Sequence, residues 1–294
     1  MPVKESFINI EEKHGLRKLA YTDWGNEDNK RVLVCVHGLS RNGRDFDFLA
    51  KSLEKDYRII CPDVAGRGNS DWLEDKKRYN YTTYVSDILI LLENLGLQKI
   101  DWVGTSMGGI IGMIIASQKA NLINKMVLND IGMHISGKAL DRIFDYVSIK
   151  PEFKSYEDAA RNLKARMLTF GLETDEQWRH IFKYSIEENN GIYTFRYDAE
   201  IVQKIPIITR ILGNIKSPRR IGKCPDVNLE KFWNKINCPV FVLRGEVSDI
   251  LSDETYNKML ASKSQTQGAV IKGVGHAPML MNDEQISYIG KWLA

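Results

Sequence analysis

Four short, largely apolar runs constrain the fold of this chain more than any other feature. They lie at residues 31–36, 57–61, 100–103 and 125–130, and segments with helical spacing lie between them at 46–53, 82–95 and 108–117. A continuous apolar run is typical of a strand that is buried on both faces of a parallel sheet. Strands that alternate with helices of this length predict βαβ units, and so an α/β fold with a mostly parallel sheet flanked by helices.

The regions on either side of this block extend the same sheet. Near the N-terminus, Phe7–Ile10 and Leu16–Asp23 predict two strands of an antiparallel hairpin. Near the C-terminus, residues 239–244 and 268–271 predict two more strands, and residues 283–293 predict a final helix.

A long segment between residues 133 and 226 interrupts this alternation. Its helical patterns and its one candidate strand lie at 140–147, 156–168, 175–188 and 192–196. An insertion with this pattern is most economically used as a helical lid over a ligand site. We therefore expect residues 1–132 and 227–294 to form a core domain and residues 133–226 to form a helical cap.

The segment Asp101–Gly112, DWVGTSMGGIIG, contains four glycines where a strand is expected to turn into a helix. Its glycine spacing does not match the phosphate-binding pattern G-x-G-x-x-G, and no Gly-Lys-Ser/Thr follows as in a Walker A loop. It does match G-x-S-x-G, which places a serine on a strained strand-to-helix turn with its hydroxyl exposed. We therefore predict that Ser106 is a nucleophile, and that Gly104 and Gly108 provide clearance around it.

A serine hydroxyl is a weak nucleophile near neutral pH, so Ser106 needs a general base within hydrogen-bond reach. The chain contains five histidines. His14 and His180 have the surroundings of surface residues, and His37 directly follows a buried strand, where a structural duty is expected. His276, in the segment GVGHAP after the last strand, can be carried over the C-terminal edge of the sheet by its loop. We predict His276 as the base.

A carboxylate should orient this histidine, and it should follow a strand that lies between the serine and the histidine in the chain. Asp249, in the segment LRGEVSDIL, is the first choice. Asp130, at the end of another strand, is its rival, and Glu246 is a weaker one. The predicted triad is therefore Ser106, Asp249 and His276, in the chain order Ser, Asp, His.

Two backbone N–H groups are needed to stabilise the negative charge that develops on the acyl oxygen. Met107 N–H begins the helix after the serine, where the helix dipole adds to its effect. The loop His37-Gly38-Leu39 follows another strand and should bring Leu39 N–H near the serine. We predict an oxyanion hole formed by the N–H groups of Leu39 and Met107.

Composition limits the class of protein and its compartment. The 294 residues include 41 Lys and Arg and 38 Asp and Glu, and the net charge of +3 is too small to suggest a nucleic-acid partner. No run approaches the ~20 apolar residues that span a bilayer, and the N-terminal segment lacks the apolar core of a secretory signal. The four cysteines show no CxxC spacing, so we expect reduced thiols in a cytoplasmic protein and no metal site. We expect the protein to be a monomer or a homodimer.

Taken together, these motifs resemble the α/β-hydrolase superfamily. The segments that carry the resemblance are HGLSRNGRDFD, PDVAGRGNSDW, GTSMGG, RGEVSD and GVGHAP, and only the detailed path of the insertion lies outside it. Within the superfamily, the chain is most similar to capped bacterial carboxylesterases and enol-lactonase-like serine hydrolases. The resemblance implies an eight-stranded sheet, a cap between strands six and seven, and neither a metal nor an organic cofactor.

The predicted function is that of a serine hydrolase that cleaves a carboxylic ester or lactone through an acyl-enzyme. Haloalkane dehalogenases and epoxide hydrolases use an aspartate where this chain has Ser106, which argues against both. C–C bond hydrolases of vinylogous diketones, thioesterases and perhydrolases are alternatives with the same triad. A ligand receptor that retains the hydrolase fold is the alternative outside enzymes.

The choice of substrate, a small-molecule ester or lactone, should depend on side chains near the cap. Met133 and His134 could reach the pocket, as could Tyr146 and Trp178 from the cap. Arg41, beside the predicted oxyanion loop, could pair with a carboxylate on the substrate. Aromatic and methionine side chains at helical spacing are more often packing residues than substrate contacts.

Overall fold

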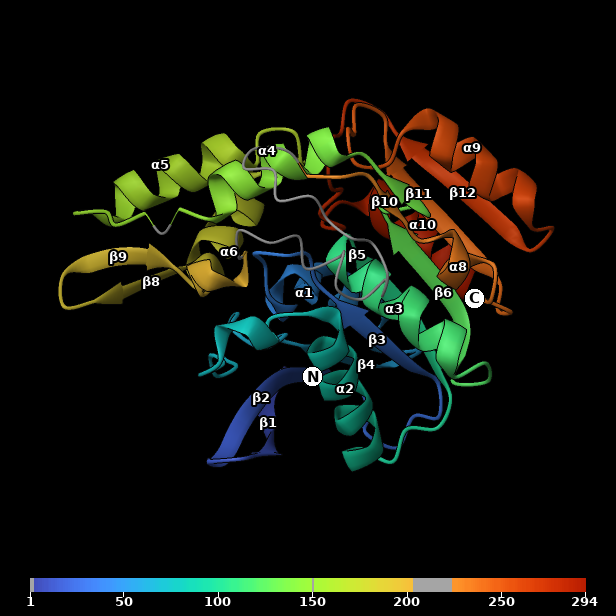
Figure 1. Cartoon of the computed structure of the whole chain (residues 1–294), viewed down its shortest axis with the longest axis horizontal. Coiled ribbons are helices and arrows are strands. Elements are labelled where there is room, and N and C mark those ends of the chain that lie inside the picture. The colour runs from blue at the N-terminus through green and yellow to red at the C-terminus, as the bar shows by residue number, and fades with distance from the viewer. Residues whose placement is uncertain (1–2, 150, 203–223) are drawn as a thin grey trace.

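An eight-stranded sheet is the central element of the computed structural model of this chain (Figure 1). The structure describes residues 3–149, 151–202 and 224–294. The strands lie in the order β1-β2-β4-β3-β5-β6-β11-β12. Their bounds are β1 Lys4–Glu12, β2 Gly15–Trp24, β3 Val32–Val36, β4 Arg58–Pro62, β5 Ile100–Thr105, β6 Ile123–Asn129, β11 Val240–Gly245 and β12 Thr266–Ile271.

The pairing of the strands is mostly parallel. From β4 to β12 in the order of the sheet, every neighbouring pair is parallel. Only β1 with β2 and β2 with β4 pair in the antiparallel sense. The predicted parallel sheet and the predicted N-terminal hairpin are therefore confirmed.

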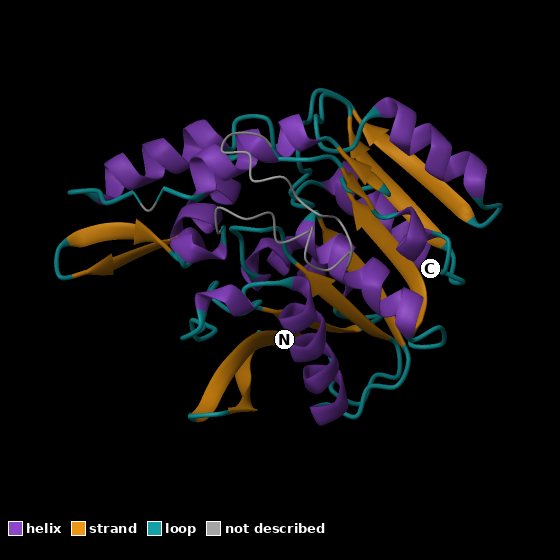
Figure 2. Ribbon diagram, in the orientation of Figure 1, coloured by secondary structure: helices purple, strands orange, loops and turns teal. Residues whose placement is uncertain are grey.

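Helices cover both faces of the sheet (Figure 2). Side chains of α1 and α10 form a core with Val103 of β5, whereas α2, α3, α8 and α9 contribute to the core that contains the neighbouring Trp102. This is the alternation that a strand buried on both faces requires. The bounds are α1 Asp47–Leu53, α2 Tyr81–Asn94, α3 Met107–Gln118, α8 Glu230–Trp233, α9 Asp253–Ser262 and α10 Asp283–Leu293, with short 3-10 turns η1 Gly43–Phe46 and η2 Lys76–Arg78. The sequence pattern assigns no element to the segments that form α8 and α9.

The segment between β6 and β11 contains both helices and strands. Its helices α4, α5 and α6 extend to one side of the sheet together with the hairpin β8–β9 (Figure 1). The bounds are β7 His134–Ile135, α4 Gly137–Val147, α5 Tyr156–Arg166, α6 Asp175–Ser185, β8 Ile186–Asn189, β9 Ile192–Phe195, η3 Ala199–Ile201 and β10 Val227–Asn228. The predicted helical cap is thus not helical throughout, and the division into core and cap stays a prediction.

The hairpin β8–β9 corrects two expectations from the sequence. The helix expected at 175–188 ends at Ser185, and the strand expected at 192–196 is one half of an antiparallel pair. Asn190 and Gly191 form the turn with φ angles of 52° and 78°. An Asn-Gly pair with positive φ at both residues is the preferred two-residue hairpin turn, so this dipeptide is the local signal that helical spacing obscured.

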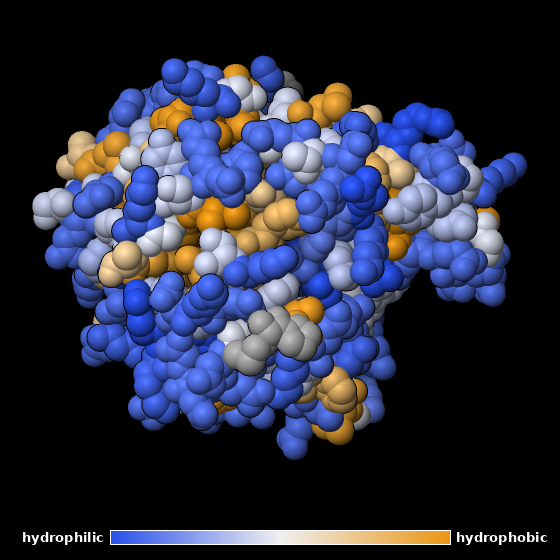
Figure 3. Space-filling model, turned by 180° about the vertical axis from the view of Figure 1, so that it is seen from behind, coloured by the Kyte–Doolittle hydropathy of each residue, from blue (hydrophilic) through white to orange (hydrophobic). Residues whose placement is uncertain are grey.

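The surface seen from behind is mostly hydrophilic, and apolar residues show on it in separate groups (Figure 3). The end formed by α5 and β8–β9 projects from the rest of the molecule (Figures 1 and 3). Within the described ranges, no helix combines the length and the apolar character that crossing a bilayer requires.

Candidate active site

The turn between β5 and α3 holds Ser106 in a rare backbone conformation. Its φ of 51° and ψ of −111° lie in a region that costs a residue with a side chain about 1–3 kcal/mol. Ser106 N–H donates to the Asn129 carbonyl at 3.0 Å, and the Ser106 carbonyl accepts from Gly109 and Ile110 N–H. These bonds fix the strained turn, and they confirm the backbone geometry that G-x-S-x-G predicts.

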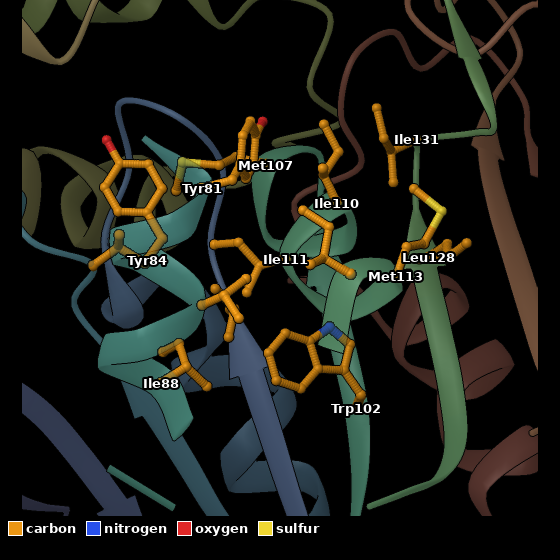
Figure 4. Close-up of a cluster of buried hydrophobic side chains, with 14 of the residues drawn as sticks. Tyr81, Tyr84, Ile88, Trp102, Met107, Ile110, Ile111, Met113, Leu128 and Ile131 are labelled. Atoms are coloured by element: carbon orange, nitrogen blue, oxygen red, sulfur yellow. The ribbon is translucent and has the colours of Figure 1, made fainter. Parts of the chain in front are cut away.

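The glycines around Ser106 stand where no side chain fits. A Cβ on Gly108 would lie 1.9 Å from the carbonyl oxygen of Val36 in β3, and a Cβ on Gly104 would lie 2.5 Å from the Gly108 carbonyl. One turn further along α3, a Cβ on Gly112 would lie 2.3 Å from the Trp102 ring nitrogen. Figure 4 shows this indole beneath the helix. The predicted clearance around the serine is confirmed, and the absence of a side chain at Gly112 lets α3 pack closely on β5.

Ser106, His276 and Asp130 form one chain of hydrogen bonds. His276 Nε2 lies 2.9 Å from Ser106 Oγ, and His276 Nδ1 lies 2.7 Å from Asp130 Oδ2. The carboxylate of Asp130 is fully buried, and it also accepts from Gly245 N–H at 2.8 Å and from the Ser248 hydroxyl at 2.5 Å. A carboxylate that only accepts hydrogen bonds places the ring proton on Nδ1, which leaves Nε2 free to accept the serine proton.

His276 Nδ1 bonds Asp130 and not Asp249, so the prediction of Asp249 as the orienting acid is wrong. Both carboxylate oxygens of Asp249 accept from Arg142 of α4, at 2.6 and 2.7 Å, and the Asp249 side chain is 47% exposed. The rival Asp130 stands in its place. The loop after β11 places the Ser248 hydroxyl, and not the side chain of the neighbouring Asp249, against the Asp130 carboxylate. Glu246, the weaker candidate, is exposed and accepts from a backbone N–H of a neighbouring loop.

His37 fixes the peptide that carries Leu39 N–H. Its ring is fully buried, and Nε2 accepts from Val64 N–H at 2.9 Å, so Nδ1 carries the proton and donates to the Gly38 carbonyl at 2.7 Å. Burial lowers the pKa of His37 to about 3, and the ring therefore stays neutral. The Gly38 carbonyl and Leu39 N–H belong to one planar peptide, so orienting the first orients the second. Arg67 Nε holds the next carbonyl, that of Leu39, at 2.8 Å.

Two cavities meet at Ser106, and both are also lined by Leu39 and Ile143. The first, here the apolar arm, includes Tyr81, Tyr84, Met107, Ile110, Leu140 and Phe144 in its walls. Figure 4 shows Tyr81, Tyr84, Met107 and Ile110 together on α2 and α3. The second, here the polar arm, includes Arg41, Asp45, Arg166, Arg196, His276 and Met279 in its walls. A ligand that occupies both arms would extend on both sides of the serine hydroxyl.

Arg41 lies in the polar arm, but its charge is already matched. Nε and one terminal nitrogen donate to the two carboxylate oxygens of Asp45 at 3.0 and 2.5 Å, and the other terminal nitrogen donates to Ser185 Oγ at 2.8 Å. Because Asp45 already pairs with the Arg41 guanidinium, the structure does not support the prediction that Arg41 pairs with a substrate carboxylate. Arg166 of α5 and Arg196, which follows β9, line the same arm. No local pattern marks these two arginines, because only the folded insertion brings them to the serine.

The other predicted pocket residues lie elsewhere. Met133 is buried and lines, together with His134, a separate cavity that does not include the serine. Trp178 is buried and packs against Phe182 with ring centroids 5.7 Å apart. The side chain of Tyr146 lies outside the described residues. In the described part of the chain, the aromatic residues that line the two arms include Tyr81, Tyr84, Phe144, Phe170, Phe195 and Tyr197.

Comparison with known proteins finds a matching family and several similar chains. A family model described as alpha/beta hydrolase fold matches residues 31–283. A 3-hydroxybutyrate-oligomer hydrolase of Cupriavidus necator is 37% identical over 281 residues, which are 96% of this chain and 94% of that protein. A solved chain from Rickettsia typhi has a TM-score of 0.87 and 36% identity over 100% of this chain and 99% of its own length. An α/β hydrolase from Novosphingobium aromaticivorans has a TM-score of 0.83 and 30% identity, with coverage of 99% and 98%.

Proposed function

Because this chain belongs to the α/β-hydrolase fold family, we propose that it is a serine hydrolase of ester bonds whose catalytic triad is Ser106, His276 and Asp130. The family resemblance and the fold predicted from the sequence are confirmed by the match over residues 31–283. The observation that carries the proposal is the continuous hydrogen-bonded chain from the serine hydroxyl through the imidazole to the buried carboxylate.

In the first half of the reaction, Ser106 Oγ attacks the acyl carbon while His276 Nε2 takes its proton. The imidazolium that forms is stabilised by the carboxylate of Asp130, which keeps the ring in the required orientation and tautomer. The bond between the acyl carbon and the alcohol oxygen then breaks. The leaving oxygen takes the proton from His276, and the acyl group stays on the serine as an ester.

The developing oxyanion is stabilised by the N–H groups of Met107 and Leu39. Met107 is the first residue of α3, where backbone N–H groups have no intrahelical partner. Leu39 N–H is supported by the His37 bond to the Gly38 carbonyl. Loss of one such donor raises the barrier by about 3–4 kcal/mol.

In the second half, a water molecule takes the place of the alcohol. His276 accepts a proton from this water as it attacks the acyl carbon of the intermediate, and the released Ser106 oxygen recovers a proton from the same ring. The products are a carboxylic acid and an alcohol, and the enzyme returns to its starting state.

We further propose that the bonds cleaved are those of short hydroxy-acid esters. The relative named for hydrolysis of 3-hydroxybutyrate oligomers covers 96% of this chain at 37% identity. Two arms that meet at Ser106 suit a substrate that continues on both sides of its ester bond. Lactones, thioesters and vinylogous diketones are the alternatives that a substrate panel separates.

The test is turnover and labelling by the purified protein. We expect hydrolysis of the linear 3-hydroxybutyrate dimer and of p-nitrophenyl butyrate, and labelling by a fluorophosphonate probe. Ser106→Ala should abolish both, whereas the matched control Ser117→Ala, whose hydroxyl donates to the Ile114 carbonyl within α3, should keep both. Turnover that survives in Ser106→Ala, or a protein that neither turns over esters nor takes the label, would contradict the proposal. Faster turnover of a thioester or a diketone would instead assign that class of compound as the substrate.

A further inference from the structure

We propose that Arg67 is a positioning residue for the oxyanion hole, and that its buried positive charge stabilises the oxyanion that forms at Ser106. The inference rests on the proposed function, because it assumes an oxyanion hole formed by the N–H groups of Leu39 and Met107. Arg67 belongs to the segment PDVAGRGNSDW, which supplies no member of the proposed triad or oxyanion hole.

The Arg67 guanidinium contacts both residues of the proposed oxyanion hole. Its Nε donates to the Leu39 carbonyl at 2.8 Å, and one terminal nitrogen lies 3.7 Å from the Met107 sulfur. The other terminal nitrogen donates to the Ala65 carbonyl at 2.6 Å, which holds the guanidinium in place. Because His37 holds the peptide before Leu39 and Arg67 holds the peptide after it, the orientation of Leu39 N–H is fixed from both sides.

The charge of Arg67 has no counter-ion among the described residues. The side chain is fully buried, and in that part of the chain it forms no ion pair. Its neighbours include the rings of Tyr79 and Tyr84, whose centres lie 5.8 and 4.9 Å from the guanidinium carbon. Asp198 accepts from the Tyr79 hydroxyl but already pairs with Lys76 at 2.5 Å. Burial of a cation without a counter-ion is costly, and the oxyanion would supply the missing negative charge during the reaction.

The charge of Arg67 acts on the walls of the apolar arm. Burial raises the pKa of the Tyr81 and Tyr84 hydroxyls, and the Arg67 charge opposes this rise at both. Both tyrosines line the arm together with Ser106 and Met107, and Figure 4 shows them beside Met107. Because a charge is weakly screened in an apolar surrounding, a cation at this place favours the anionic transition state over the neutral ester.

The loop that carries Arg67 is held by the insertion. Gly66 and Gly68 flank Arg67 with φ angles of 82° and 55°. Gly68 N–H donates to the Arg196 carbonyl at 3.0 Å, and Asp198 N–H donates to the Gly66 carbonyl at 2.8 Å. The backbone on both sides of Arg67 is therefore bonded to the segment after β9. A charge that is fixed in advance needs no reorganisation when the oxyanion forms, which is the condition for a large effect on the rate.

Removal of the charge should slow the reaction without weakening the binding of a neutral substrate. Arg67→Met keeps an unbranched side chain but removes the charge and the N–H donors. We expect kcat for p-nitrophenyl butyrate to fall about 10²-fold, as is typical for loss of one oxyanion-hole donor, while KM stays within about twofold. Arg67→Lys keeps the charge but not the planar fork of donors, so it should recover about tenfold of this loss.

The most specific measurement is the pKa of an oxyanion that the enzyme holds. With a trifluoromethyl propyl ketone, Ser106 Oγ adds to the carbonyl carbon, the serine proton passes to His276, and the carbonyl oxygen becomes the oxyanion of a hemiketal. ¹³C NMR of a labelled carbonyl carbon follows the titration of this oxygen. We expect its pKa to rise by about one unit in Arg67→Met, which corresponds to about 1.4 kcal/mol, and to stay within a few tenths of a unit in Arg67→Lys.

The matched control is Arg17→Met, at a second buried arginine. Arg17 of β2 pairs with Asp87 and Glu12, so its loss should lower the melting temperature, because it leaves a buried carboxylate without its partner. The values of kcat and of the hemiketal pKa should stay at those of the intact enzyme. This control separates a general loss of stability from a loss of charge at the oxyanion. If Arg67→Met does not fold, Arg67→Gln replaces it, because the glutamine amide is neutral and can still donate to a carbonyl.

The outcomes distinguish failure of this inference from failure of the proposed function. An unchanged kcat or an unchanged hemiketal pKa in the folded neutral variant would overturn the inference. A loss that appears in KM alone, or a hemiketal pKa that rises equally in Arg67→Lys, would do the same. If the intact protein forms no hemiketal, or if Ser106→Ala forms one, the proposed function fails instead.

Discussion

Replacing Asp130 by asparagine should disable this enzyme without unfolding it. In the native site, one carboxylate oxygen accepts from His276 Nδ1–H and the Ser248 hydroxyl, and the other accepts from Gly245 N–H. An amide has only one acceptor oxygen. If that oxygen stays with Gly245, the NH₂ group faces His276 and donates to Nδ1, which forces the ring proton onto Nε2. The ring then donates to Ser106 and can no longer accept its proton.

The opposite orientation of the amide is also unfavourable. If the amide oxygen faces His276, the NH₂ group meets Gly245 N–H, and two donors face one another in a fully buried place. An unsatisfied buried group costs about 1–3 kcal/mol. We therefore expect the wrong tautomer to dominate and kcat to fall by about 10⁴, as removal of the acceptor does in other triads. That loss corresponds to about 5.5 kcal/mol in the barrier.

The matched variant is Asp249→Asn, at the carboxylate that the sequence favours. It removes one ion pair with Arg142 in which both side chains are about half exposed, and such pairs contribute about 0–1 kcal/mol. We expect kcat for p-nitrophenyl butyrate within about twofold of the wild-type value in that variant. Thermal unfolding of both variants controls for misfolding. A large loss in Asp249→Asn combined with near-normal activity in Asp130→Asn would refute the assignment of the acid.

Three further variants, one of them paired with a control variant, test the surroundings of the triad. Ser248→Ala removes a 2.5 Å donor to Asp130 and should lower kcat about tenfold, because hydrogen bonds to charged groups are worth about 1.5–3 kcal/mol; unchanged turnover would count against this support. Gly108→Ala places a Cβ 1.9 Å from a β3 carbonyl and should destabilise the fold by more than about 4 kcal/mol, whereas Gly290→Ala, in α10 with its nearest contact at 3.7 Å, should be neutral or stabilising in urea unfolding. The pKa of His37 is about 3 in the folded protein, compared with 6.5 for an unperturbed histidine. Between these two pH values the unfolded chain binds a proton at His37 that the folded protein does not bind. The free energy of unfolding should therefore fall as the pH falls from about 6.5 toward 3. His37→Asn should flatten this dependence in thermal unfolding at pH 4 to 7, and an unchanged slope would assign it to other groups.

Local sequence signals are sufficient to predict Ser106 and His276 in the hydrogen-bonded chain, but not to predict Asp130. Ser106 and His276 each stand in a short motif whose backbone geometry places the side chain at the sheet edge. Asp130 and Asp249 both follow a strand, and the choice between them depends on how the loop after β11 folds. That loop brings the Ser248 hydroxyl, and not the next acidic residue, to the site.

The same contrast applies to the fold: elements with a local sequence pattern are predictable, whereas contacts between segments far apart in the chain are not. Continuous apolar runs predict the parallel strands because burial on both faces leaves a simple pattern. The hairpin β8–β9 has a local signal in Asn190-Gly191, but the helical spacing before it hides the boundary. Arg166 and Arg196 have no such signal, because they approach Ser106 only through the path of the folded insertion.

The most direct test of the proposed mechanism is the mass of the intact protein during turnover of p-nitrophenyl butyrate. If Ser106 is the nucleophile, rapid acid quenching should trap a protein heavier by one butyryl group, and peptide mapping should locate that group on the peptide that contains Ser106. Asp130→Asn should accumulate this species more slowly, and Ser106→Ala should not form it. An adduct on another residue, or wild-type turnover by Ser106→Ala, would contradict the account.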